Sequence, residues 1–301
     1  MPSFTARLLE TSARLLIKRV IDAPTFDLRR VRRAMDSRRT LPGFLPRDVT
    51  VRVSTDAALR GEWHEPADAV PGRTLLHLHG GAFIAGTPKA FRPLAAWMAK
   101  WARARVFVLD YRLAPEHPFP AGLDDCVAAV RALYARGVAP AQLGLAGDSA
   151  GGALVLATLC SLRDAGDPLP AAAALISPLT DLAGTGGTMT SNAATEAMLS
   201  SRHQATLIDW YAGAHGATHP LVSPLYGEAR GLPPLLIHAS DAEVLLDDAR
   251  RYADKARAAG VDVRIRVFRG QVHDFHASVP LTRESRGAVR EVGEFLAARL
   301  G

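Results

Sequence analysis

From about residue 48 onward, short apolar runs alternate with longer segments whose apolar residues recur at helical spacing. The run 74–79 is almost continuously apolar, which indicates a strand covered on both faces. Strands separated by helices of this length predict parallel β-α-β crossovers, and therefore an α/β fold with a sheet covered by helices on both faces. We expect strands at 48–54, 61–64, 74–79, 105–111, 143–147, 171–177, 234–239 and 262–269, and helices at 88–102, 121–136, 150–165, 247–259 and 283–300.

Two segments break this alternation. Residues 1–45 are helical in pattern and precede every strand, while residues 183–222 combine a Gly/Thr-rich turn, a helix at 200–211 and a Pro-rich exit. Insertions of this size between core elements usually form lids over a site. We therefore predict a helical cap from 1–45 and 183–222, and a core from 46–182 and 223–301, as parts of one unit.

The charge balance does not point to a nucleic-acid partner. The chain carries 36 Lys and Arg against 30 Asp and Glu, for a net charge of +6. The arginine cluster at 29–39 would suit a nucleic-acid patch, but Val31 and Met35 interrupt it at helical spacing. This pattern favours the solvated face of an amphipathic helix.

Composition also favours a cytoplasmic protein. Cys126 and Cys160 lie in alanine-rich helical patterns and form no disulfide framework, so we expect two small buried side chains. No apolar run reaches the roughly 18 residues of a membrane helix, and the N-terminus lacks a secretory signal. The segment 8–21 alternates basic and apolar residues and would suit a membrane surface, but packing on the protein is favoured. We expect no stable membrane insertion.

The strongest chemical signal is the sequence GDSAGG at 147–152. It places Ser149 in a Gly-x-Ser-x-Gly motif between an apolar strand and an alanine-rich helix, which is the setting that a nucleophile elbow requires. The glycines permit a sharp turn that lifts the serine hydroxyl off the end of the sheet. We predict Ser149 as a nucleophile; the alternative is a glycine-rich turn that cradles a phosphate.

A second glycine-rich segment, HGGAF at 79–83, follows the strand 74–78. Acyl transfer creates an oxyanion, which needs backbone N–H donors from a preformed loop. Gly80 and Gly81 are expected to supply two donors, and Ala150, directly after the nucleophile, a third. We expect His79 to hold this loop by hydrogen bonds.

These motifs, together with DYRLAPEHPFP at 110–120, resemble the hormone-sensitive-lipase-like family of bacterial esterases. The resemblance covers nearly the whole chain and implies an α/β-hydrolase fold. The family usually has HGGGF where this chain has Ala82, a change expected to reshape the pocket wall. In the segment 110–116, we expect Arg112 and Glu116 to pair on a turn fixed by Pro115, as scaffolding.

The resemblance also places the remaining site residues. The family pattern G-x-x-H-x-F falls on 270–275 and gives His273 the catalytic position, with His276 as its neighbouring rival, expected at the pocket rim or surface. The family pattern D-P-L-x-D-[DE], set on Asp247 and Asp248, puts the acid at Glu243. Asp241 is the alternative.

The expected function is hydrolysis of short-chain carboxylic esters through an acyl-enzyme on Ser149, with His273 as base and Glu243 as its partner. No cofactor or metal is expected, because the remaining histidines show no ligand spacing. The alternatives are a lactone, amide or acetyl-group hydrolase with the same triad, and a catalytically idle fold that binds a ligand. A small-molecule ester is the expected partner, and the strand 262–269 would suit a homodimer.

Overall fold

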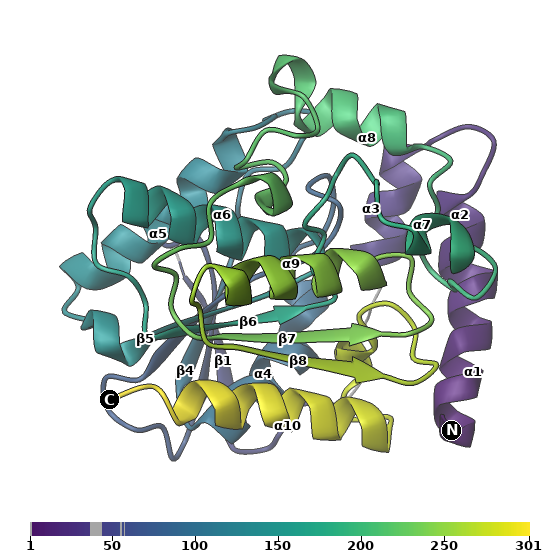
Figure 1. The fold of residues 1–301 in the computed structure, drawn as a ribbon. Helices are drawn as coiled ribbons and strands as arrows, with labels where there is room; N and C mark the ends of the chain where they lie inside the picture. Colours follow the sequence, from purple (N-terminus) through teal and green to yellow (C-terminus); the bar gives the residue numbers. More distant parts are fainter. Residues whose placement is uncertain (1, 37–43, 55, 57) are drawn as a thin grey trace.

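The computed structural model describes residues 2–36, 44–54, 56 and 58–301. Within them, eight strands form a single sheet (Figure 1). The strand order is β1-β2-β4-β3-β5-β6-β7-β8. β1 and β2 run antiparallel to their neighbours, and all other neighbouring strands are parallel. The bounds are β1 (Val49–Ser54), β2 (Gly61–Pro66), β3 (Thr74–Leu78), β4 (Arg105–Leu109), β5 (Leu143–Asp148), β6 (Ala172–Ile176), β7 (Leu235–Ser240) and β8 (Val263–Phe268). The predicted, mostly parallel α/β sheet is confirmed.

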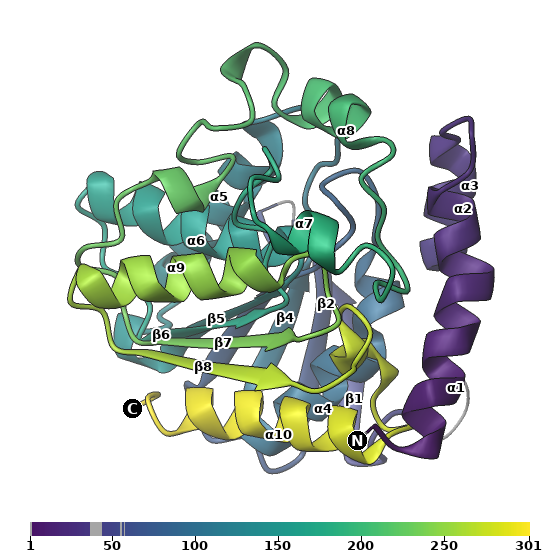
Figure 2. The same cartoon turned by 45° about the vertical axis from the view of Figure 1, so that its right-hand side comes forward.

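Helices cover both faces of this sheet (Figure 2). On one face, α4 (Arg92–Ala102) and α10 (Arg283–Ala297) pack together and bury residues such as Met98 and Val292. On the other face lie α5 (Ala121–Ala135), α6 (Ala150–Asp164) and α9 (Leu246–Ala258), which bury residues such as Val130, Leu154 and Tyr252. The sheet therefore separates two apolar cores, as expected for crossover helices on both sides.

The central strands owe their position to their composition. Every residue of β3, β5, β6 and β7 is buried, whereas the residues of the edge strands β1 and β8 are half-buried or exposed, apart from Val263. Continuous apolar runs are stable only between two covered faces, so these strands form the centre of the sheet. The carboxyl ends of the parallel strands consequently meet at one edge, where loops from several strands converge.

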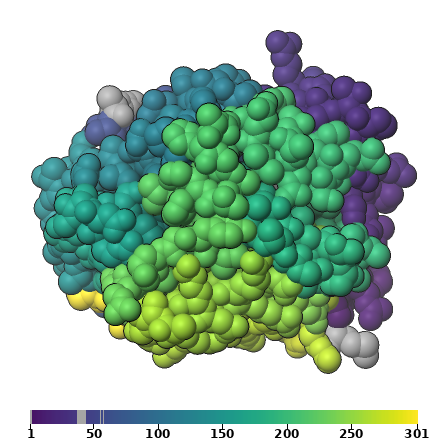
Figure 3. All heavy atoms as spheres, turned by 45° about the horizontal axis from the view of Figure 1, so that its top comes forward, coloured from purple at the N-terminus to yellow at the C-terminus, as the bar shows by residue number. Residues whose placement is uncertain are grey.

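The segments outside this pattern lie together over that edge. The N-terminal part contains α1 (Phe4–Ala13), a π-helical turn η1 (Arg14–Lys18), α2 (Arg19–Ile21) and α3 (Leu28–Asp36), and the insertion contains α7 (Thr188–Ser191) and α8 (Gln204–Tyr211). Figure 3 shows the two segments side by side on the surface. Short 3₁₀ turns complete the chain: η2 (Pro88–Phe91), η3 (Pro140–Gln142), η4 (Gly213–His215), η5 (Pro224–Tyr226) and η6 (Phe275–Ser278). The division into cap and core stays a prediction, and Arg38 and Arg39 of the arginine cluster lie outside the described residues.

The insertion helix begins later than its sequence pattern indicates. The predicted span 200–211 becomes Gln204–Tyr211, because Ser200 is held elsewhere. Its hydroxyl donates to Asp22 Oδ1 at 2.7 Å and accepts the N–H of Arg202 at 3.2 Å. Such local side-chain bonds compete with the first helical turn.

The expected pairing of Arg112 with Glu116 is wrong. Arg112 instead forms an ion pair with Asp125 of α5, with its Nη2 2.8 Å from Oδ1. Glu116 pairs with Arg32 of α3 at 2.6 Å, and this bond holds the pKa of Glu116 at about 2. The scaffolding role is retained, but each residue ties its turn to a helix distant in the sequence, which no local pattern encodes.

Candidate active site

Ser149 lies in a strained turn between β5 and α6. Its backbone has φ 52° and ψ −120°, a conformation that is costly for any residue with a Cβ. The turn is fixed by a hydrogen bond from the N–H of Ser149 to the carbonyl of Ile176 at 2.8 Å. A side chain at Gly151 would place its Cβ 1.9 Å from the carbonyl oxygen of Leu78, and one at Gly147 would meet Gly151 at 2.4 Å. The sequence therefore folds here only with glycine on both sides of the serine.

A buried carboxylate holds the imidazole of His273. His273 Nδ1 lies 2.8 Å from Glu243 Oε2, and the two side chains are 4% and 1% exposed. The other carboxylate oxygen accepts the hydroxyl of Ser177 and the N–H of Ser240, each at 2.8 Å. Three hydrogen bonds thus fix the carboxylate, and through it the plane of the imidazole ring.

Burial and hydrogen bonding act in opposite directions on this pair. Burial raises the pKa of Glu243 above its ordinary value. Burial also lowers the pKa of His273, but the hydrogen bond and charge of Glu243, with the charges of Glu196 and Asp274, outweigh it and raise that pKa. The raised pKa of Glu243 alone would place the shared proton on the carboxylate, whereas the raised pKa of His273 places it on the imidazole. We place it on His273 Nδ1, because the hydrogen bonds to Glu243 favour its anion.

The rival residues of the sequence analysis lie elsewhere. Asp241 Oδ1 accepts the N–H of Gly270 at 2.6 Å, at the exposed end of the loop. His276, expected at the pocket rim or surface, is wholly buried, with Nε2 3.0 Å from Nδ1 of His238. Of the two acids left open, Glu243 is the one that contacts His273.

The loop after β3 is anchored beneath the site. His79 Nδ1 lies 2.9 Å from the carbonyl oxygen of Gly80, and the ring stacks between Phe91 and Tyr111. Tyr111 donates its hydroxyl to the carbonyl of His79 at 2.7 Å. The expectation that His79 holds this loop is confirmed.

Gly80 does not have the role that its position in the motif indicates. Its N–H donates to Asp148 Oδ2 at 2.9 Å, so this donor is already engaged and the prediction that it binds an oxyanion is wrong. In the described part of the chain, no acceptor is recorded for the N–H groups of Gly81 and Ala82. Ala82 has φ 54° and lines the cavity, as predicted for a pocket-wall residue.

Asp148 and Glu196 were not predicted as site residues. The carboxylate oxygen Oδ1 of Asp148 lies 3.1 Å from His77 Nε2 of β3, and its Oδ2 accepts the N–H of Gly80. Asp148 thereby connects the residue before the serine to the loop after β3. The motif GDSAGG contains Asp148, so a signal existed in the sequence. No motif marks Glu196, whose partners come together only in the folded chain.

Glu196 belongs to a latch that we define as residues 192–196, between the N-terminal helices and the acid loop 241–244. Its buried carboxylate accepts the N–H of Met198 at 2.7 Å and of Val244 at 3.2 Å. Asn192 Nδ2 donates to the carbonyls of Asp241 and Glu243.

On its other side, the latch is held by two cations. Arg14 donates to the carbonyls of Ala194, Thr195 and Glu196, and Lys18 to those of Ala193 and Glu196.

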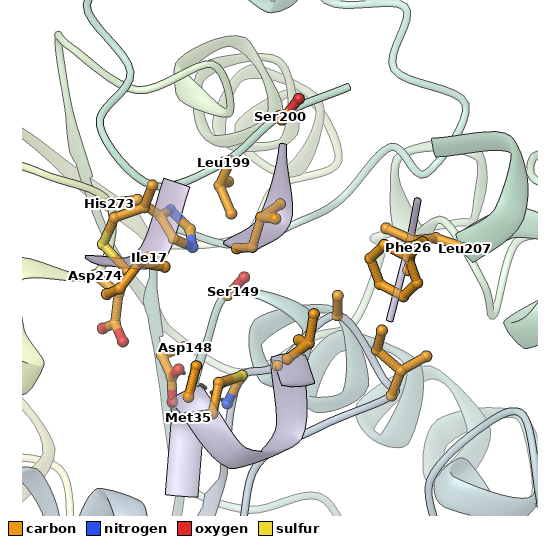
Figure 4. Close-up of a pocket in the computed structure, with 18 of the residues that line it drawn as sticks. Ile17, Phe26, Met35, Asp148, Ser149, Leu199, Ser200, Leu207, His273 and Asp274 are labelled. Atoms are coloured by element: carbon orange, nitrogen blue, oxygen red, sulfur yellow. Dashed lines mark hydrogen bonds between the residues drawn. The ribbon is translucent and has the colours of Figure 1, made fainter. Parts of the chain in front are cut away.

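Ser149 and His273 face one cavity of about 130 Å³ (Figure 4). Within the described residues no hydrogen bond joins the two, although both side chains point into this space. Apolar side chains from both cap segments form most of its wall: Ile17, Ile21, Phe26, Val31, Met35, Met198, Leu199 and Leu207. Trp210 and Tyr211 of the same insertion do not line this cavity and pack on Phe26 and Phe83.

Neither a metal site nor a membrane-crossing helix is found in the part of the chain that the structure describes. No three His, Cys, Asp or Glu side chains gather closely enough to hold a metal ion. No helix has both the length and the apolar character needed to cross a bilayer.

The comparisons with known proteins agree with this geometry. A family described as alpha/beta hydrolase fold matches residues 75–277. The chain is 43% identical over 240 residues to an acetyl-hydrolase of Streptomyces hygroscopicus, covering 80% of each chain. It is 38% identical over 270 residues to the esterase LipU of Mycobacterium tuberculosis, covering 86% of this chain and 90% of LipU. A crystal structure of an esterase from the bacterial hormone-sensitive lipase family superimposes over 100% of both chains with a TM-score of 0.93 and 35% identity.

Proposed function

Because the chain belongs to the hormone-sensitive-lipase-like esterases of the α/β-hydrolase fold, we propose that it hydrolyses short-chain carboxylic esters through an acyl-enzyme on Ser149. The chain is a carboxylic-ester hydrolase that acts on small-molecule esters. The residue roles, the covalent intermediate and the chain-length preference are our proposal. The observation that carries it is the buried Glu243–His273 pair at 2.8 Å, facing the same cavity as the strained Ser149.

In the first step, the hydroxyl oxygen of Ser149 attacks the carbonyl carbon of the ester, and the second ring nitrogen of His273 takes the hydroxyl proton. Glu243, bonded to Nδ1, stabilises the imidazolium that forms. The raised pKa of His273 makes it the stronger base for this transfer. The tetrahedral intermediate then expels an alkoxide, which takes the same proton from His273 and leaves as the alcohol.

The oxyanion is held by the N–H groups of Gly81, Ala82 and Ala150. The first two lie on the loop after β3, where Asp148 fixes Gly80 and thereby presents the next two N–H groups to the cavity. Ala150 is the first residue of α6, so its N–H lacks a partner within the helix and the helix dipole adds to its effect. Water activated by His273 then attacks the acyl-enzyme and releases the acid.

The cavity supports a short, neutral acyl group. The described side chains around it are largely apolar and include no Lys or Arg, so an anionic acyl chain would lose its hydration without gaining a partner. The similarity to an acetyl-hydrolase favours acetyl esters among the short substrates. A lactone or an amide would use the same machinery.

The test is hydrolysis of p-nitrophenyl esters from acetate to palmitate by the wild type and by Ser149→Ala. Turnover that decreases with chain length and disappears in Ser149→Ala supports the proposal, whereas equal activity in the variant refutes it. A fluorophosphonate that fails to label Ser149 would favour the idle, ligand-binding fold instead.

We also propose a homodimer and a cytoplasmic location. Among the described strands β8 pairs with β7 alone, so its outer edge offers backbone groups to a second copy. Cys126 and Cys160 are buried free thiols, which suit a reducing compartment. Light scattering after size exclusion tests the dimer, and monomers at all concentrations would refute it.

A further inference from the structure

The N-terminal helix turns its large apolar residues outward. Along α1 and η1, the side chains of Phe4, Leu8, Leu15 and Leu16 are 77%, 52%, 49% and 69% exposed. The residues of α1 that are buried against the protein are alanines, Ala6 and Ala13. A surface helix normally faces its protein with the large apolar residues, so this arrangement is inverted. Figure 2 shows the helix at the margin of the molecule.

The charges around these four residues are mainly positive, and the one acid among residues 4–19, Glu10, is paired with Arg14. The other exposed positions between Phe4 and Arg19 are Thr5, Arg7, Thr11, Ser12 and Arg19, and none of them is acidic. Over residues 1–36 there are eight Lys and Arg against four Asp and Glu, which gives +4 of the chain's net +6. We call the exposed side chains of residues 4–19 the outer face. It combines an apolar row with flanking cations, which is typical of helices that lie in a membrane interface.

A groove leads from the outer face to the active site. Leu16 lines it at one side and Leu281, 44% exposed, at the other. Its apolar wall continues through Ile17 and Met198 to His273. The groove does not include Ser149, whereas the cavity described above includes both residues. A chain that enters along the groove therefore reaches the imidazole from the side of the cap.

We propose that the outer face docks on an anionic lipid surface, and that the groove admits lipid esters from that surface to His273. The second part rests on the proposed esterase function, because it assigns the groove to an ester substrate. A bilayer fits better than a protein partner, because large apolar side chains follow one side of a single helix and the cations Arg7 and Arg19 flank them, while the acid Glu10 is paired with Arg14. The helix lies on the surface without spanning it, in keeping with the absence of a crossing helix among the described residues.

The first experiment measures binding to sedimented vesicles of phosphatidylcholine alone and of phosphatidylcholine with phosphatidylglycerol. The test variant is Leu8→Ser with Leu15→Ser, two exposed residues that line neither the cavity nor the groove. The matched control is Val53→Ser with Val267→Ser, exposed apolar residues on the edge strands. We expect the wild type and the control to bind the anionic vesicles, and the test variant to bind them roughly tenfold more weakly.

The second experiment separates docking from catalysis. All three proteins should hydrolyse soluble p-nitrophenyl acetate at the same rate, while the test variant should lose roughly tenfold in rate on the acetyl ester of a long-chain alcohol embedded in anionic vesicles. Vesicle binding without turnover of any ester would overturn the esterase function and leave docking intact. Three outcomes would overturn the docking proposal. They are turnover without vesicle binding, equal binding to neutral and anionic vesicles, and a dimer that the test variant abolishes.

Discussion

Replacing Glu243 by glutamine is expected to move the acid limb of the pH–rate profile to lower pH. The carboxylate lies 2.8 Å from His273 Nδ1, so the two charge centres are about 4 Å apart. At an effective dielectric constant of about 20, this separation corresponds to about 4 kcal/mol, or about 3 pKa units. Burial lowers the pKa of His273, and the hydrogen bond and charge of Glu243, with the charges of Glu196 and Asp274, outweigh it, so removing the charge of Glu243 should lower that pKa.

The sign follows from which form of His273 is active. Neutral imidazole accepts the serine proton, so the wild type loses kcat/KM as the pH falls through the raised pKa of His273. In Glu243→Gln this loss should occur at lower pH, and the weaker, less well oriented base should reduce kcat/KM by roughly 10³- to 10⁴-fold. The assay is hydrolysis of p-nitrophenyl butyrate between about pH 5 and pH 10, corrected for spontaneous hydrolysis.

The matched control is Asp241→Asn, which removes a carboxylate from the same loop. Asp241 binds the N–H of Gly270 and does not contact His273, so activity should stay within a few-fold and the acid limb should not move. The reasoning is refuted if the acid limb of Glu243→Gln stays in place or moves to higher pH, or if Asp241→Asn produces the larger effect.

Three further substitutions test the geometry of the site. Ser149→Gly should abolish activity but raise the free energy of unfolding by about 1 kcal/mol, seen as a higher melting temperature than that of Ser149→Ala, because glycine relieves the positive φ of 52°. Gly81→Ala should reduce kcat by at least about 10²-fold, since a Cβ at φ 128° would lie 2.0 Å from the carbonyl of Ala85; a fully active variant would contradict this. Glu196→Gln should lower the acid limb of the pH profile, because the charge of Glu196 helps to raise the pKa of His273, whereas the exposed Glu294→Gln should leave the profile unchanged.

The parts of the site that follow from local sequence were predictable. Ser149 is placed by a strand, a turn and a helix that adjoin one another in the chain, and Gly147 is required by contact with that same helix, although Gly151 is required by the end of β3. The mostly parallel sheet and the helices on both faces follow from the alternation of apolar runs and helical segments, whereas the order of the strands was not predicted. Local patterns are sufficient where the partners are neighbours in sequence.

The errors concern partners that only the tertiary structure brings together. The motif identifies Gly80 but does not reveal that Asp148, 68 residues later, already engages its N–H. Arg112 has an acid within its own turn, yet pairs with one on α5. His276 lies three residues after His273, but its 3₁₀ turn directs it away from the cavity to a buried contact with His238 of β7. Sequence spacing does not determine these hydrogen-bond and ion-pair partners, because each partner depends on which polar groups the folded chain buries away from water.

The latch 192–196 links the stability of the cap to the chemistry of the core. Arg14 and Lys18 bind one side of this segment, and the acid loop that carries Glu243 binds the other. If warming detaches η1, which carries Arg14 and Lys18, from the latch, the acid loop loses its support while the sheet, buried on both faces, stays folded. Loss of activity on heating should therefore precede the cooperative melting of the sheet, and a cross-link between Arg14 and the latch should bring the two temperatures together.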